Sequence, residues 1–181
     1  LANTADDNVA VGYWALLDNT TGQMNTAVGV YALEENTTGS YNTALGEQAL
    51  ENSTTASYCT AVGRQALTSM TGNGINEAFG NRSGYGISTG SYNTCIGNHA
   101  GYNITTGSNN TLLGRYAAGD ALGTGNNMTG SNNTLLGIYA GAQVTTGSAN
   151  TAVGAYALDY STTASQTTAL GAYAGSAITT G

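Results

Sequence analysis

A nine-residue pattern of polar, small and apolar positions, Asn-Thr-Ala-Val-Gly-x-x-Ala-Leu, recurs with variations along the whole chain. The glycine at its centre returns every 17 residues, apart from one interval of 23. A fixed period of this length is typical of a solenoid, in which each repeat forms one turn and packs on its neighbours. The ten copies of this glycine are Gly12, Gly29, Gly46, Gly63, Gly80, Gly97, Gly114, Gly137, Gly154 and Gly171.

Each position of the repeat, counted from the Asn as position one, has its own residue class. Position one is mostly Asn, whose side chains can hydrogen-bond along a stack of equivalent turns, and position two is mostly Thr. The glycine at position five suits a tight corner of the backbone. We expect a structural ladder along the stack that includes Asn25, Asn42, Asn93, Asn110, Asn133, Asn150, Gly29, Gly46, Gly97, Gly114, Gly137 and Gly154.

Two further columns predict the core. Position four is always a sizeable apolar residue, and position eight is small, usually Ala. We expect the two columns to face each other across a narrow core. Each repeat then consists of a strand, a corner, a second strand and a longer Thr-Thr-Gly-Ser turn. The sequence thus predicts one all-β domain over residues 1–181, a parallel β-solenoid or β-roll of about ten 17-residue coils.

The single long interval, between Gly114 and Gly137, contains six residues more than the period. We place this six-residue insertion within residues 118–127. Insertions in solenoids usually form loops on one face. A neutral insertion at a turn and a binding loop are both compatible with the sequence.

Charge excludes some classes of partner. The chain has three Lys and Arg residues together and a net charge of −7, so it lacks the basic groove that nucleic acid requires. No apolar run approaches the roughly 18 residues of a membrane-inserted helix. Cys59 and Cys95 lie two repeats apart, at least about 9.6 Å, which exceeds the reach of a disulfide, so we expect two free thiols.

Candidate catalytic groups are scarce. His99 lies in a column that other repeats fill with Tyr or Gln, and no partner is spaced to make it a catalytic base. The ten acidic residues do not align into a column, as a solenoid enzyme that cleaves polysaccharide would need. We therefore expect no enzyme activity, no catalytic residues, no metal and no cofactor.

An aromatic column at position seven is the strongest candidate surface. Stacked one coil apart, its rings could pack within the chain, pack against a neighbouring chain, or bind sugars. Its members are Trp14, Tyr31, Tyr116, Tyr139, Tyr156 and Tyr173.

Sequons for N-glycosylation are numerous, and many fall in the connectors between pattern copies. The candidate sites are Asn19, Asn36, Asn52, Asn81, Asn103, Asn109, Asn127 and Asn132.

Threonine-rich β-faces are also typical of ice-binding solenoids, usually as Thr-x-Thr. Here the connector Thr pairs are adjacent in sequence, so strand alternation sends them to opposite sides. Both ends of the sequence fall in connectors without a cap, so we expect either that the natural chain continues, that protomers stack end to end, or that an oligomer covers the strand edges.

The iterated Asn-Thr-Ala-Val-Gly-x-x-Ala motif, with its Gly/Ser/Thr-rich connectors, resembles the head repeats of trimeric autotransporter adhesins of the YadA-like type. Similar repeats occur in phage tail-fibre-like and bacterial surface fibre proteins. The resemblance covers nearly the whole chain. It implies a left-handed parallel β-roll, usually trimeric, that holds or presents an adhesive surface outside the cell.

Together these features predict a structural and adhesive fibre protein, located outside the cell, at the cell surface or in a virion fibre. Its expected partner is itself, either in a homotrimer or in an end-to-end filament. A host surface protein and a glycan are the further candidate partners. An ice-binding or glycan-binding solenoid is the remaining alternative.

Overall fold

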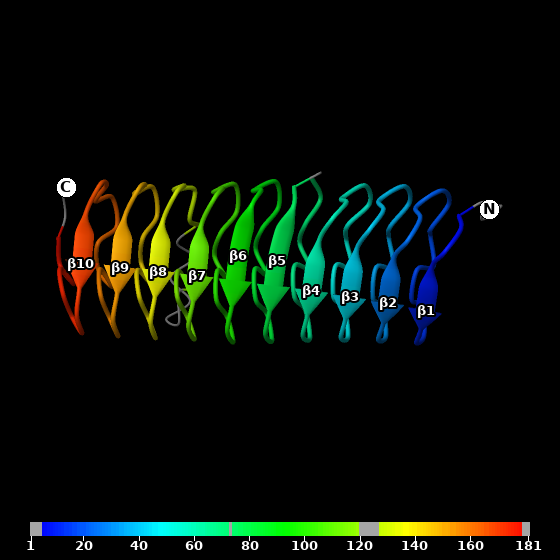
Figure 1. Ribbon diagram of the computed structural model, residues 1–181, viewed down its shortest axis with the longest axis horizontal. Helices are drawn as coiled ribbons and strands as arrows, with labels where there is room; N and C mark the ends of the chain where they lie inside the picture. The colour runs from blue at the N-terminus through cyan, green and yellow to red at the C-terminus, as the bar shows by residue number, and fades with distance from the viewer. Residues whose placement is uncertain (1–4, 73, 120–126, 179–181) are drawn as a thin grey trace.

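The computed structural model describes residues 5–72, 74–119 and 127–178, which form a rod of stacked coils (Figure 1). One short strand from each repeat joins a ten-stranded parallel sheet in chain order. The strands are β1 (Val9–Val11), β2 (Thr26–Val28), β3 (Thr43–Leu45), β4 (Thr60–Val62), β5 (Asn76–Phe79), β6 (Asn93–Ile96), β7 (Thr111–Leu113), β8 (Thr134–Leu136), β9 (Thr151–Val153) and β10 (Thr168–Leu170). The predicted parallel β-solenoid is confirmed.

The coil is left-handed, as the resemblance implies. In Figure 1 the sheet lies on the near side, its strands run downwards, and successive strands advance towards the left. Nine strand spacings of about 4.8 Å separate β1 from β10 by about 43 Å.

The strands pair in strict register with the repeat. Thr26 lies beside Thr43, and this one-period match continues along the sheet. Across the insertion, Thr111 still pairs with Thr134, so the extra residues leave the sheet uninterrupted. Residues 120–126, where most of the predicted loop lies, are outside the described residues.

The predicted core partner at position four is wrong. That column points outward, and position three faces the interior instead: Ala27 is fully buried, whereas Leu45 is 46% exposed. Strand alternation explains the change, because the buried Asn at position one puts positions one and three on the same side. The small column at position eight is buried as expected, as at Ala32 and Ala49.

The side chains at positions nine and twelve fill the rest of the interior, and a smaller residue at one position can be offset by a larger residue at the other. Where position nine is Leu, as at Leu50, position twelve can be as small as Ser53. Where position nine is glycine, an Ile or Val occupies position twelve, and a Cβ placed on Gly101 would lie 3.2 Å from Ile104 Cδ1. The two positions therefore share one close-packed space.

The predicted second strand is also wrong. After the corner glycine the described chain forms consecutive turns, not a strand. Residues at positions seven and nine adopt left-handed backbone, for example Tyr31 with φ 60° and Leu33 with φ 52°. Hydrogen bonds to both neighbouring coils hold this conformation: Tyr31 N–H donates to Tyr13 O at 2.9 Å and Leu33 N–H to Ala49 O at 3.0 Å. Stacking thus offsets a backbone cost of about 1–2 kcal/mol per non-glycine residue.

The Asn ladder connects each coil to the next inside the rod. The side-chain amide of Asn25 donates to Gly39 O at 2.8 Å, and its Oδ1 accepts the backbone N–H of Asn42 at 2.9 Å. Cys59 interrupts the ladder but keeps a donor, since its thiol donates to Gly74 O at 3.1 Å. The ladder residues Asn25, Asn42, Asn93, Asn110, Asn133 and Asn150 are all at most 1% exposed.

Replacing Asn133 by Ala should lower the free energy of unfolding by about 3 kcal/mol, because it leaves a buried acceptor and a buried donor of the following repeat without their hydrogen-bond partner. Asn133 donates to Gly147 O at 3.0 Å and accepts from the N–H of Asn150 at 3.0 Å. Urea unfolding followed by circular dichroism measures the change. Asn98→Ala, at an exposed position, is the matched control and should change the value by less than about 0.5 kcal/mol. Equal effects of the two substitutions would contradict the ladder.

The corner glycines allow the coils to approach each other. Two of them distinguish the effect of this close approach from the effect of the positive φ. Gly137 and Gly171 have φ of 140° and 121°, but a Cβ on Gly137 would lie 2.4 Å from Gly154 O, whereas one on Gly171 meets nothing within 4 Å. We expect Gly137→Ala to cost about 3 kcal/mol or more, and Gly171→Ala only the backbone strain of about 1–2 kcal/mol. Thermal unfolding of both variants tests this, and a larger effect at Gly171 would refute the close-approach account.

Candidate interaction surfaces

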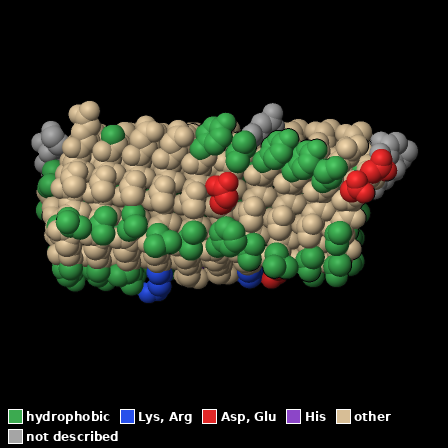
Figure 2. All heavy atoms as spheres, viewed as in Figure 1, with side chains coloured by type: hydrophobic (Ala, Val, Ile, Leu, Met, Phe, Trp, Pro, Cys, Tyr) green, Lys and Arg blue, Asp and Glu red, His purple; other side chains and the backbone are tan. Residues whose placement is uncertain are grey.

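The outward column at position four forms an apolar stripe along the sheet, which we call the sheet stripe. None of its side chains is buried, and Leu113 and Phe79 are 45% and 42% exposed. Figure 2 shows hydrophobic side chains following one another across this face. The sheet stripe consists of Val11, Val28, Leu45, Val62, Phe79, Ile96, Leu113, Leu136, Val153 and Leu170.

Beside the sheet stripe runs the outward column at position two. It is Thr in β2–β4 and β6–β10, with Val9 in β1 and Glu77 in β5. Glu77 is the only charged residue in the strands of the described part of the chain. The sheet face therefore carries one Thr column beside one aliphatic column, and not two Thr columns.

The aromatic column at position seven lies along the next corner, which we call the corner ridge. Its rings form two groups. Trp14 and Tyr31 meet edge to face, with centroids 5.7 Å apart. The longer group of Tyr116, Tyr139, Tyr156 and Tyr173 is stacked with centroids 4.9–5.2 Å apart and interplanar angles of 18° or less. Stacked rings cover each other's faces, so this group presents mainly ring edges to solvent.

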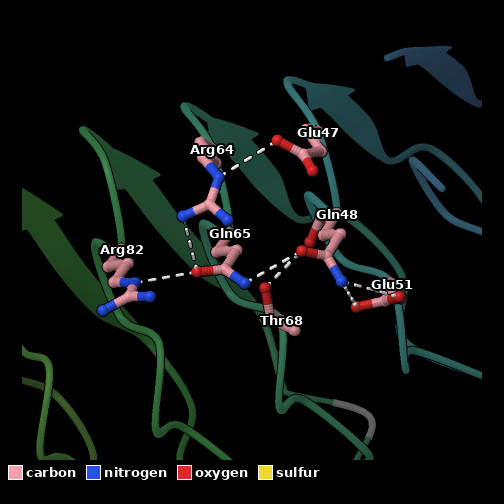
Figure 3. Close-up of polar contacts among 7 residues, drawn as sticks. All are labelled: Glu47, Gln48, Glu51, Arg64, Gln65, Thr68 and Arg82. Atoms are coloured by element: carbon pink, nitrogen blue, oxygen red, sulfur yellow. Dashed lines mark hydrogen bonds and ion pairs between the residues drawn. The ribbon is translucent and has the colours of Figure 1, made fainter. Parts of the chain in front are cut away.

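A polar chain separates the two aromatic groups (Figure 3). Gln48 donates to Glu51 at 2.9 Å, and Gln65 donates to Gln48 at 2.9 Å. Gln65 Oε1 in turn accepts from Arg82 Nε at 2.8 Å and from Arg64 Nη1 at 3.2 Å. Hydrogen-bonded polar side chains thus continue the corner ridge through the coils that have no aromatic ring at position seven.

His99 joins the polar and aromatic parts of the ridge. Its ring stacks on Tyr116 at 4.9 Å and its Nδ1 lies 2.7 Å from Asn98 Oδ1. Burial lowers the pKa of His99, and the charges of Arg82 and Arg115 lower it further. These effects favour the neutral form of the imidazole.

A second set of exposed rings precedes the Asn column and was not singled out from the sequence. Tyr41 and Tyr58 stack at 4.9 Å with their planes 3° apart, and Tyr92 is 61% exposed. Each of these tyrosines directly precedes position one of its repeat, and this spacing could have identified the column from the sequence. Each has left-handed φ near 60°, where Tyr is costly and Asn, as at Asn109, is favoured.

The structure divides the candidate glycosylation sites. Asn19 and Asn36 are 5% and 0% exposed, so both side chains are buried in the folded coil. Asn19 Oδ1 instead accepts a hydrogen bond from Asn36 at 2.8 Å. Asn52, Asn81 and Asn103 are partly exposed, and Asn109, Asn127 and Asn132 are exposed.

The described residues lack two kinds of site. They contain no group of three or more His, Cys, Asp or Glu that could hold a metal ion. They also contain no helix with the length and apolarity that a membrane crossing requires. Both cysteines are free, as the sequence predicted, and both are buried.

Comparison with known proteins adds no family. No family model, no curated protein and no solved structure matches the chain.

The two thiols should be unreactive in the native protein. Burial raises the pKa of Cys59 to about 11 and that of Cys95 to about 12. At pH 8 less than about one thiol in a thousand is then ionised, and the thiolate is the reactive form. A colorimetric disulfide reagent should detect almost no thiol before unfolding and two per chain in urea. Cys59→Ala should reduce the urea value to one; fast native reaction would contradict the burial.

Proposed function

We propose that this chain is a structural and adhesive rod of an extracellular fibre, at a cell surface or in a virion, and that it acts without catalysis. The observation that carries the proposal is the sheet stripe, an exposed apolar column as long as the rod. Monomeric proteins rarely expose a contiguous apolar surface of this extent, and such surfaces usually mark interfaces.

The periodicity of the stripe favours a second copy of the chain as its partner. Its side chains repeat at one strand spacing, about 4.8 Å. A copy of the same solenoid carries apolar side chains at the same spacing, so two stripes can interdigitate over many rungs. A closed symmetric oligomer, a trimer above all, would cover the stripe of every copy.

Side-by-side association would leave the corner ridge and the connectors as the outer surface. Repetition of weak contacts along such a rod, and across several copies, raises the effective affinity for a surface. This supports adhesion, because each coil presents a variant of the same surface.

A second candidate is a subunit of an end-to-end filament. In the described sheet β1 and β10 each pair with one strand only, which leaves one edge of each open. An open parallel edge is a template for a further strand. In this arrangement coils would continue across the boundary between copies.

Electron microscopy of the undenatured protein, combined with its mass in solution, distinguishes the two candidates. We expect discrete rods with a mass of a small multiple of 18.1 kDa, three for a trimer. Long fibres would instead support the end-to-end filament. A monodisperse monomer at all accessible concentrations would contradict both.

Charged substitutions test the sheet stripe itself. Ile96→Glu with Leu113→Glu should convert the assembly into monomers, because burying two carboxylates in an apolar interface is costly. The matched control, Thr106→Glu with Thr146→Glu, adds the same charge at exposed connector positions and should leave the mass unchanged. Circular dichroism must show that both proteins stay folded. An unchanged mass of the folded stripe variant would exclude the stripe as the interface.

A further inference from the structure

All the basic side chains of the protein gather at one corner. The chain has three Arg residues, no Lys and one His. Arg82 and His99 lie on the corner ridge at position seven, and Arg64 and Arg115 lie directly beside it at position six. The four residues come from consecutive coils, so they occupy a short segment of the rod.

These cations differ in how their charge is balanced. Arg64 forms an ion pair with Glu47, with Nε and Oε2 3.0 Å apart. Arg82 and Arg115 form no ion pair with any described residue. In a chain with a net charge of −7, two unpaired guanidinium groups on one segment are an unexpected arrangement.

Arg82 is half-buried and Arg115 is exposed, and each guanidinium group lies over a tyrosine ring. Arg82 donates only its Nε, to Gln65, and its Cζ lies 5.8 Å from the centroid of Tyr85. Arg115 is exposed, and its Cζ lies 4.8 Å from the centroid of Tyr116. Stacking on a ring orients a guanidinium group while leaving its N–H edge available to an anion.

Stacked tyrosine rings lie in the same segment as the two arginines. Tyr85 and Tyr102 are stacked 5.0 Å apart, and His99 lies 5.1 Å from Tyr102. His99 belongs to the coil between those of Arg82 and Arg115, and the charges of both act on it. The segment therefore combines two cations, about 9.6 Å apart along the rod at two strand spacings, with aromatic carbon surface.

We propose that the segment from Arg82 to Arg115 binds an acidic oligosaccharide through its carboxylate or sulfate groups. A planar guanidinium group binds such oxyanions in bidentate fashion, and tyrosine rings contact the apolar faces and edges of sugars. The two-coil spacing is comparable with the length of a disaccharide, so the arginines can contact acidic groups on neighbouring disaccharides. The proposal rests on the proposed adhesive function and names the ligand class of its surface.

The charge of the rest of the chain limits the interaction. Acidic residues elsewhere repel a long polyanion, so each site should be weak and should weaken further as salt screens the two arginines. Useful strength would then come from several sites in one assembly.

Isothermal titration and nuclear magnetic resonance of the His99 ring test the proposal with three probes of similar length. Oligogalacturonate supplies carboxylates, a heparin-derived oligosaccharide supplies sulfates as well, and maltohexaose is neutral. We expect at least one acidic probe to bind and to shift the His99 signals, and maltohexaose to do neither. Binding of oligogalacturonate identifies carboxylate as sufficient, and binding of the heparin fragment alone identifies sulfate.

Arg82→Gln and Arg115→Gln should each weaken the binding of the acidic probe about tenfold or more, through loss of a charge-assisted contact. Arg64→Gln is the matched control, since Glu47 already pairs with that cation, and should change the affinity less than twofold. Absence of binding, equal binding of maltohexaose, or an equal loss in Arg64→Gln would overturn the proposal. The mass of the Arg82→Gln and Arg115→Gln assemblies is measured in parallel, so failure of this site is distinguishable from failure of the fibre.

Discussion

The hydrogen bond between the amide of one coil and the backbone of the next is the constraint on which the rest of the structure depends. Each ladder Asn is buried, where an unpaired amide would cost several kcal/mol. Its partners exist only if the next coil repeats the same geometry at the same height. The strand register and the choice of inward positions both fit this requirement.

The ladder also determines which residues are left for function. With Asn42 inward, alternation places Ala44 inward and Thr43 and Leu45 outward. Small and amide side chains at positions one, three and eight share the interior with larger ones such as Leu50 and Ile104, while the whole apolar column at position four lies outside. A solenoid of this kind has a modest core and a large repetitive surface, which suits assembly better than it suits a catalytic pocket.

The period predicted the parallel β-solenoid, its register and the Asn ladder, because these follow from the repetition alone. Orientation did not follow: Val28 at position four and Ala27 at position three both suit a core, and only the inward amide of Asn25 decides between them. The turns after the corner were missed because Tyr31 and Leu33 adopt left-handed backbone that their side chains disfavour. At the candidate sites, the sequence could not show that Arg82 and Arg115 lack an ion pair. Arg64 occupies the same part of the repeat, and only the structure shows that it pairs with Glu47.

The most direct test of the account is hydroxyl-radical footprinting of the sheet stripe in the assembled protein, read out by mass spectrometry. Side-by-side packing predicts that Ile96 and Leu113 are oxidised much more slowly in the assembly than after dilution to single chains. Tyr41 and Tyr58, exposed beside the Asn column, serve as internal references of constant reactivity. Equal oxidation of the stripe at high and low concentration would mean that the stripe is free, and would contradict the account.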